Sequence, residues 1–105
     1  MTTVDLAVLD NIEFDEQGFM ADANAWNEAI AYALAADEGV MLTDRHWVVI
    51  NYARKEFAEN GDAPTIRRIT RFTDVNTKEL YELFPNGPAK LAALIAGLPK
   101  PTGCI

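Results

Sequence analysis

Apolar and polar positions follow different spacings in different parts of this chain, and the spacing predicts where its elements lie. Residues 4–20 mix short apolar and acidic stretches around Asp10-Asn11 and Glu16-Gln17-Gly18. This pattern favours a short β-hairpin or two short strands. Because an isolated hairpin is only marginally stable, we expect it to pack against the rest of the molecule.

From residue 23 onward the spacing becomes helical. The first helix has Asn24 as its expected N-cap and Gly39 as its stop. Its apolar face consists of Trp26, Ile30, Ala33 and Leu34. Thr43 is the expected cap of a second helix, which Asn60-Gly61 ends. The apolar stripe of that helix consists of Val49, Ile50, Ala53 and Phe57.

Three shorter helices are predicted in the rest of the chain. Pro64 suits the first turn of one that runs through about Arg71. Residues 76–79 have the spacing of a capping box with Asn in place of Ser or Thr, and Pro88 opens a last helix that reaches Ala96. The residues expected to face the core are Leu80, Leu83, Phe84, Leu91, Leu94 and Ile95.

The pattern ends in a segment that favours neither helix nor strand. Gly97 is the expected C-cap of the last helix, and Pro99 and Pro101 prevent its continuation. We therefore predict an α+β, mainly α, domain over residues 1–97 and a flexible C-terminal arm over residues 98–105.

Composition agrees with one small domain. The chain has 105 residues, 50% of them hydrophobic, which is enough for a single core. One cysteine cannot form an internal disulfide, and a lone free thiol fits a reducing compartment. No stretch approaches the about 20 apolar residues of a membrane span, and the first five residues lack the basic region of a signal peptide. These features predict a cytoplasmic protein.

Charge is distributed unevenly along the chain. The net charge is −7, yet residues 1–44 hold ten acidic residues and no Lys or Arg, whereas residues 45–105 hold nine Lys plus Arg and six acidic residues. The acidic part would repel nucleic acid and membrane surfaces, so we expect neither as a direct partner. The basic part suits an acidic partner, although the same charges also serve ordinary solubility.

Cys104 is the residue with the clearest chemical potential. It is the only cysteine and the penultimate residue of the sequence, where an arm would give its thiol access to another protein. A thiolate can attack a persulfide, carry its outer sulfur as Cys–S–SH and pass that sulfur to the next thiol. The sequence therefore predicts Cys104 as the catalytic residue of a sulfur carrier.

The motifs that precede this cysteine resemble those of a known family. They are Asp15-Glu16-Gln17-Gly18-Phe19, Thr43-Asp44-Arg45-His46-Trp47, Ala63-Pro64-Thr65-Ile66-Arg67, Leu83-Phe84-Pro85-Asn86-Gly87-Pro88-Ala89-Lys90 and the terminal Pro101-Thr102-Gly103-Cys104. In this order they resemble the DsrC/TusE family of sulfur-relay proteins over about residues 10–105. The resemblance implies a helical bundle with a helix-turn-helix-like pair and an N-terminal hairpin, and sulfur transfer through Cys104 without a cofactor.

The resemblance also bears on the pathway. The sulfite reductase-linked branch carries a second cysteine in the last helix, with which it forms a disulfide or trisulfide, and the matching position here is Ala93. This implies single-cysteine transfer as in the TusE branch, between a TusBCD- or DsrEFH-like complex and a tRNA thiolation enzyme. The Pro-Thr-Gly-Cys ending is instead typical of the sulfite reductase-linked branch. Docking to dissimilatory sulfite reductase, without trisulfide chemistry, is therefore the alternative.

Two further hypotheses stay open at this point. A binding or regulatory module could use the helix-turn-helix-like pair on DNA, which the acidic first part of the chain disfavours because phosphate contacts need local positive charge. An inert interaction subunit would carry its cysteine incidentally. A persulfide formed on Cys104 would distinguish a sulfurtransferase-type carrier from the binding module and from the inert subunit. Such a carrier is not a stand-alone catalyst.

Three positions are candidate docking or anion contacts. Arg67 matches the arginine of the family motif and stands close in sequence to Arg68 and Arg71. Lys90 and Lys100 flank the last helix and the arm. The alternative for each is a solvated surface charge.

His46 is the only histidine. It could act as a base only if the arm folds back onto the second helix, and we favour a partly buried residue at the helix start with a satisfied ring nitrogen. One His and one Cys cannot complete a four-ligand zinc site, so neither a metal nor a cofactor is expected. Trp26 and Trp47 are expected in the core.

Overall fold

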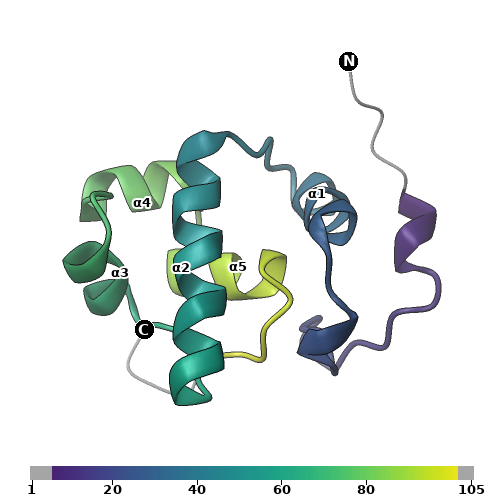
Figure 1. The fold of residues 1–105 in the computed structure, drawn as a ribbon. Coiled ribbons are helices and arrows are strands. Elements are labelled where there is room, and N and C mark those ends of the chain that lie inside the picture. Colours follow the sequence, from purple (N-terminus) through teal and green to yellow (C-terminus); the bar gives the residue numbers. More distant parts are fainter. Residues whose placement is uncertain (1–5, 102–105) are drawn as a thin grey trace.

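A computed structural model describes residues 6–101, which form a mainly helical molecule as predicted (Figure 1). Its elements are η1 (Leu6–Leu9), η2 (Ala23–Ala25), α1 (Glu28–Asp37), α2 (Asp44–Asn60), α3 (Ile66–Phe72), α4 (Thr77–Leu83) and α5 (Pro88–Ile95). The short helices α3 and α4 contact each other across a four-residue connection and form the helix-turn-helix-like pair. No helix within residues 6–101 is long and apolar enough to cross a bilayer.

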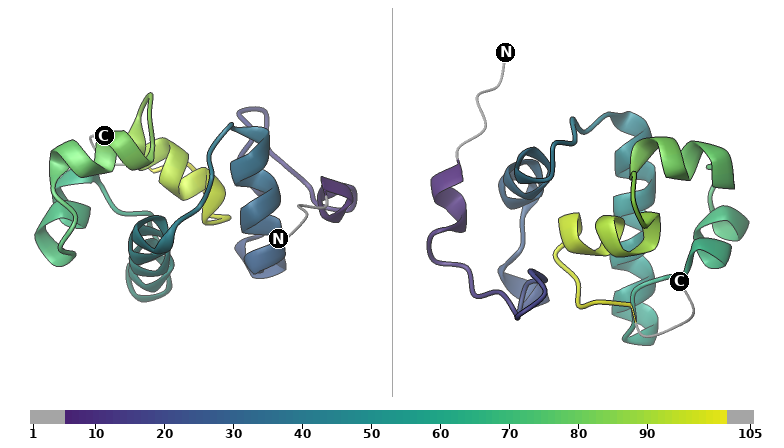
Figure 2. Two further views of the ribbon diagram at one scale, coloured as in Figure 1. Left: turned by 90° about the horizontal axis from the view of Figure 1, so that it is seen from above. Right: turned by 180° about the vertical axis from the view of Figure 1, so that it is seen from behind.

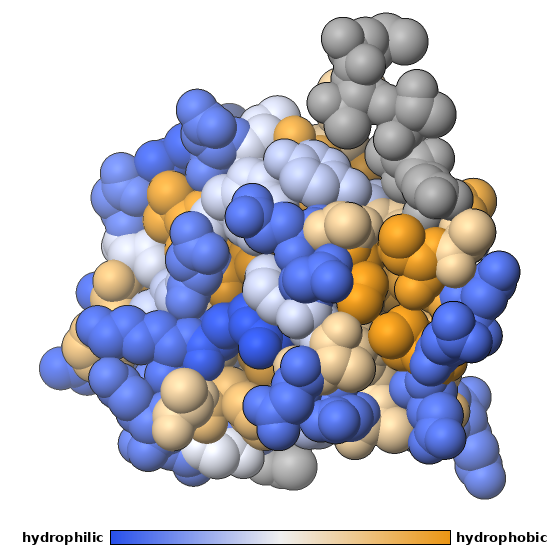
Figure 3. Space-filling view, turned by 45° about the vertical axis from the view of Figure 1, so that its right-hand side comes forward, coloured by the Kyte–Doolittle hydropathy of each residue, from blue (hydrophilic) through white to orange (hydrophobic). Residues whose placement is uncertain are grey.

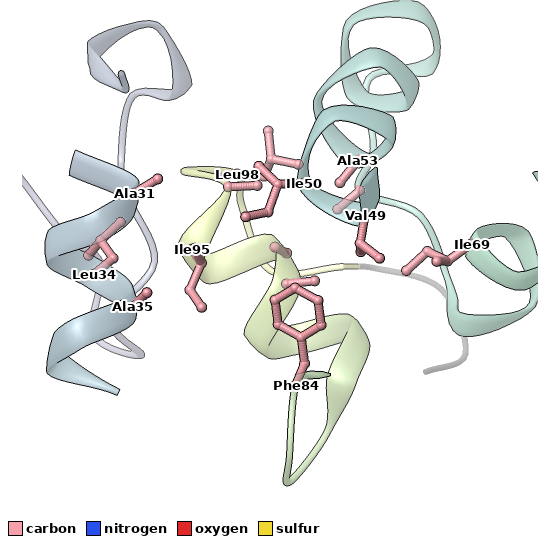
Figure 4. Packing of buried hydrophobic residues seen from close by; sticks show 14 of the residues in the cluster. Ala31, Leu34, Ala35, Val49, Ile50, Ala53, Ile69, Phe84, Ile95 and Leu98 are labelled. Carbon is pink, nitrogen blue, oxygen red and sulfur yellow. The ribbon is translucent and has the colours of Figure 1, made fainter. Parts of the chain in front are cut away.

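Helix α5 is the central element. It contacts α1, α2 and α4, and the views from above and behind place it among them (Figure 2). Apolar side chains from these helices converge on α5 (Figure 4), and most of the side chains that α5 presents to them are small. The buried residues of α5 are Pro88, Ala89, Ala92, Ala93 and Ile95. Alanine lets its neighbours approach closely, so the core is dense around this helix.

Two expected core positions of α5 are wrong. Leu91 and Leu94 are only partly buried, whereas Ala92 and Ala93 are fully buried. The side of α5 that faces its three neighbouring helices is filled by Pro88, three alanines and Ile95. The two leucines therefore lie on the remaining strip of the helix surface, next to Lys90.

Two helices begin where their capping residues predict. Thr43 precedes α2, and Asn76 caps α4 by accepting a hydrogen bond from the Glu79 amide at 2.8 Å. The Glu79 carboxylate does not complete the capping box, because it accepts hydrogen bonds from the Arg45 guanidinium at 2.8 Å. Arg45, which also pairs with Asp74 at 3.0 Å, thereby joins the start of α2 to α4.

Two predicted helix starts are shifted. Asn27, not Asn24, caps α1, and its side chain accepts from the Ile30 amide at 3.0 Å. Asn24 lies inside η2, and Trp26 is extended because its indole is held by a distant carbonyl. Thr65 caps α3, so Pro64 lies just before the helix rather than in its first turn.

The predicted N-terminal hairpin corresponds to a single antiparallel bridge between Phe14 and Met20. Between them the Asp15 carboxylate accepts hydrogen bonds from the amides of Gln17 at 2.8 Å and Phe19 at 3.0 Å. These two hydrogen bonds hold the turn between the bridged residues. Residues 6–9 form the 3-10 helix η1 in place of a strand. No strand is present among residues 6–101.

η1 packs against α1 and leaves apolar surface exposed. Leu6 is 51% exposed. Hydrophobic residues, drawn in orange, gather on the right-hand side of the face in Figure 3, among hydrophilic residues drawn in blue.

The C-terminal end of α5 is fixed by hydrogen bonds from three directions. The amides of Gly97 and Leu98 donate to Leu94 at 3.1 Å and to Ala93 at 2.9 Å, which is the Schellman arrangement. The next two carbonyls of the helix end bind side chains. Trp26 Nε1 donates to the Ile95 carbonyl at 2.9 Å, and Arg54 Nη1 donates to the Ala96 carbonyl at 2.7 Å.

Gly97 is required for this arrangement for two reasons. Its φ is +72°, where only glycine is unstrained. In addition, a Cβ placed on Gly97 would overlap the Trp26 indole. Gly39 ends α1 with φ +76°, but a Cβ there would meet nothing within 4 Å.

The two glycines make a matched pair of substitutions. We expect Gly39→Ala to lower the free energy of unfolding by about 1–2 kcal/mol, the cost of a left-handed alanine. Gly97→Ala should cost about 1–3 kcal/mol more, because the methyl group also overpacks against Trp26. Urea denaturation of both variants measures the difference, and equal losses would show that the Trp26 contact contributes nothing.

Candidate functional site: the stem of the C-terminal arm

The predicted catalytic residue, Cys104, lies outside residues 6–101, which the structure describes. The structure does describe the first four residues of the predicted arm, 98–101. Leu98 is 0% exposed and belongs to the core, Pro101 is buried, and Lys100 is half-buried. We call residues 97–101 the stem of the arm, because they pack on the body and lead directly to the cysteine.

Two of the three candidate docking residues meet in space. Lys90 on α5 and Lys100 in the stem line the same surface cavity, which has a volume of about 320 Å³. They come together because the chain reverses at Gly97 and brings the stem back beside the helix. The sequence places these lysines ten residues apart and gives no sign that they share a site.

The remaining walls of this cavity are apolar or neutral. Its full lining is Gln17, Phe19, Asn86, Lys90, Leu91, Leu94 and Lys100. Leu91 and Leu94 are the two leucines of α5 that are only partly buried. Phe19 comes from the turn that joins the bridged residues Phe14 and Met20. We call this cavity the lysine pocket.

A strained turn sets one edge of the lysine pocket. Asn86 has φ +64° and Gly87 has φ +99°, so two successive residues adopt the left-handed region. Asparagine tolerates this conformation better than other residues with a side chain, and glycine adopts it freely. The turn points the chain into Pro88, the first residue of α5, and so determines where Lys90 stands.

The third candidate, Arg67, lies elsewhere. It is exposed on α3 and is not part of the lysine-pocket lining. Its neighbours have structural contacts: Arg68 pairs with the buried Glu56 at 2.7 Å, and Arg71 lies 5.5 Å from the Phe72 ring centroid. The structure therefore separates Arg67 from the two lysines, and its docking role stays a prediction.

His46 is a structural residue, as the sequence favoured. Its Nδ1 accepts a hydrogen bond from the Thr43 amide at 3.1 Å, and its Nε2 lies 2.8 Å from the Leu83 carbonyl. A carbonyl only accepts, so Nε2 carries the proton and the ring is neutral. Nδ1 is bonded to the N-cap of its own helix α2, and Nε2 links α2 to the last residue of α4, which leaves neither nitrogen available as a catalytic base in this arrangement.

This environment makes stability depend on pH. Burial lowers the pKa of His46 below its usual value of 6.5, although the hydrogen bond to Leu83 partly opposes the shift. The unfolded chain therefore binds a proton that the folded chain resists, and stability falls as the pH drops below about 6.5. Protonation would also turn Nδ1 into a donor facing the Thr43 amide.

We expect His46→Gln to reduce this dependence. Glutamine at this helix position can still accept from the Thr43 amide but does not titrate. Between pH 7.5 and 5.5, the wild-type protein should lose more free energy of unfolding than the variant, by at most about 1.4 kcal/mol per pH unit. Urea denaturation across this range measures both slopes, and parallel slopes would refute the assignment.

The two tryptophans are partly buried and pack against the core rather than lying inside it. Trp26 carries the Arg54 guanidinium over its ring at 4.1 Å, a favourable cation–π contact. Trp47 donates to the Tyr32 hydroxyl at 3.2 Å. Together with Glu28 and Asn51, the rings of Trp26, Tyr32 and Trp47 line a hollow of about 470 Å³, and neither Lys90 nor Lys100 belongs to its lining.

Sequence reasoning missed Arg54 and most of the lysine-pocket lining. Arg54 lies within a helix among other charged residues, and nothing local marks it as the ligand of two distant carbonyls. The unused signal for the pocket was the Asn-Gly-Pro turn followed by Leu91 and Leu94 at helical spacing beside Lys90. Within residues 6–101 no group of three or more His, Cys, Asp or Glu side chains could hold a metal ion.

Comparison with known proteins assigns this architecture to a family. The family model described as DsrC like protein matches residues 8–105. The chain belongs to this DsrC-like family. The match includes the stem, the lysine pocket and Cys104, which confirms the resemblance inferred from the motifs.

Curated relatives and solved structures of the DsrC-like family cover nearly the whole chain. The sulfurtransferase TusE of Pectobacterium atrosepticum is 44% identical over 101 residues, spanning 90% of this chain and 93% of the relative. That of Salmonella typhimurium is 42% identical with the same coverage. Allochromatium vinosum DsrC superposes with a TM-score of 0.78 at 40% identity, covering 90% of both chains.

A further solved structure connects the DsrC-like fold to sulfite reduction. The oxidised γ-subunit of dissimilatory sulfite reductase (DsrC) from Archaeoglobus fulgidus has a TM-score of 0.78 to this chain at 41% identity. The match covers 90% of this chain and 92% of the γ-subunit. The predicted fold is thus confirmed by solved structures that are similar to this chain in both fold and sequence.

Proposed function

We propose that this protein is a sulfur carrier of the sulfurtransferase TusE type, in which Cys104 bears the transferred sulfur. The observation that carries the proposal is the match to TusE relatives at 42–44% identity over 101 residues. The DsrC-like family match runs to residue 105 and so includes Cys104.

The transfer step exchanges one S–S bond for another. The Cys104 thiolate attacks the outer sulfur of a donor persulfide, and a new S–S bond forms. The S–S bond of the donor breaks, and its electron pair leaves on the donor cysteine as a thiolate. Cys104 is then a persulfide, Cys–S–SH. A thiolate of the next protein attacks its outer sulfur in the same way, and Cys104 leaves as a thiolate. No electrons are gained or lost overall, so no cofactor is needed.

Single-cysteine transfer follows from the residue at position 93. Sulfite reductase-linked members use a second cysteine there, whereas Ala93 is 1% exposed in the core and has no thiol. An intramolecular disulfide or trisulfide is therefore excluded for this chain. Sulfur bound to Cys104 must pass directly to another protein.

For partners we propose a TusBCD- or DsrEFH-like donor complex and a tRNA thiolation enzyme as acceptor, in the cytoplasm. Direct binding of this chain to nucleic acid is not part of the proposal, because its first 44 residues contain ten acidic residues and no Lys or Arg. The alternative acceptor is dissimilatory sulfite reductase. The similarity to the Archaeoglobus fulgidus γ-subunit and the Pro-Thr-Gly-Cys ending favour it.

The carrier function predicts a defined mass change. After incubation with glutathione persulfide, intact mass spectrometry should show addition of one sulfur, about 32 Da, that a reductant removes. The Cys104→Ser variant should show no addition. The function is refuted if wild-type protein stays unmodified with both small-molecule and protein persulfide donors.

A further inference from the structure

The lysine pocket has an electrostatic character opposite to that of the protein as a whole. Its lining contains two lysines and no carboxylate, whereas the chain carries a net charge of −7. Arg45 and Arg68 are neutralised by acidic neighbours, but nothing acidic in the lining pairs with Lys90 or Lys100. The only charged side chains that line the pocket are therefore cationic, which favours an anionic ligand.

The same pocket also offers apolar surface. Leu91 and Leu94 lie outside the core and are only partly buried, and Phe19 closes the wall on the other side. An apolar wall beside charged groups is typical of protein docking sites, where a side chain enters a pocket and polar contacts surround it. A volume of about 320 Å³ accommodates one or two side chains.

The geometry of the stem limits what can cover this pocket. Leu98 is 0% exposed, and its amide donates to the Ala93 carbonyl at 2.9 Å. Residues up to Leu98 therefore cannot leave the body without disrupting the core. Cys104 follows Lys100 by four residues, and four extended residues span at most about 14 Å. A protein that takes Cys104 into its active site must therefore come within that distance of Lys100.

We propose that the lysine pocket is the docking site for the protein that gives sulfur to Cys104. The occupant is an acidic segment at the rim of that protein's active site. Its carboxylates bind Lys90 and Lys100, and an apolar side chain next to them enters between Leu91, Leu94 and Phe19. This inference rests on the proposed sulfur-carrier function and adds how the carrier is recognised.

Docking at this distance from the thiol has a mechanistic use. The stem is held at the Gly97 reversal, so binding at the pocket fixes the position of the stem, which precedes Cys104 in the sequence, relative to the donor protein. Fewer orientations have to be lost when the thiol enters the donor site. The lysines also raise the association rate with an acidic surface, an effect that added salt screens.

Charge reversal at Lys90 tests the proposal, because Lys90 is distant from Cys104 in sequence and exposed at the start of α5. Sulfur transfer is measured from two donors: a persulfide-loaded TusBCD-type complex, and glutathione persulfide. For Lys90→Glu we expect kcat/KM with the protein donor to fall about tenfold or more, through a raised KM. The ratio of the protein-donor rate to the small-molecule rate should fall by the same factor.

Matched variants separate docking from general charge. Lys55→Glu and Lys78→Glu make the same charge change at exposed positions on α2 and α4, outside the pocket, and should transfer sulfur at the wild-type rate. Leu94→Ala keeps the charge but removes the apolar wall, and should also raise KM for the protein donor. Circular dichroism and thermal unfolding verify that each variant folds.

The outcomes distinguish this proposal from the function it rests on. If Lys90→Glu and Leu94→Ala behave like wild type with the protein donor, or slow both donors equally, the docking proposal is overturned while the carrier function stands. It is also overturned if wild-type protein takes sulfur from glutathione persulfide but not from the complex. If wild-type protein takes sulfur from neither donor, the carrier function itself fails.

Discussion

The hydrogen bonds at the C-terminal end of α5 are the interactions on which the rest of the structure depends. The last carbonyls of a helix lack partners within the helix, and burying them without partners costs about 1–3 kcal/mol each. Here Gly97 and Leu98 satisfy two of them by reversing the chain, and Trp26 and Arg54 satisfy the next two. Because Arg54 also binds the Ala23 carbonyl at 3.2 Å, one guanidinium joins α2, the lead-in to α1 and the end of α5.

This arrangement also determines where the stem of the arm lies. The chain reversal brings Lys100 beside Lys90 and so creates the lysine pocket, while Leu98 anchors the stem in the core. Cys104 follows the buried Pro101 by three residues in the sequence. In the proposed function the fold would supply position and recognition, and the thiol of Cys104 would supply the chemistry.

How much of the fold the sequence predicts depends on the range of the interactions involved. Short-range signals were reliable, since Thr43, Asn76 and Gly39 end or begin helices where capping rules place them. Tertiary contacts overrode them elsewhere: the indole of Trp26 reaches the Ile95 carbonyl, and α1 begins later than the pattern indicated. In α5 the position of the neighbouring helices, which no spacing rule contains, determines that Ala92 and Ala93 are buried while Leu91 and Leu94 are only partly buried.

The site was predictable only in part, for the same reason. The sequence predicts Cys104 as the catalytic residue and Arg67, Lys90 and Lys100 as docking contacts, but the presence of both lysines in one pocket depends on the reversal at Gly97 and on a turn far away in sequence. The most direct test is native-state hydrogen exchange at the amides of Gly97 and Leu98. The account predicts protection close to that of buried core amides such as Ile50, with exchange only through global unfolding. Exchange at the rate of an unstructured peptide would contradict it, because the arm would then have no fixed stem.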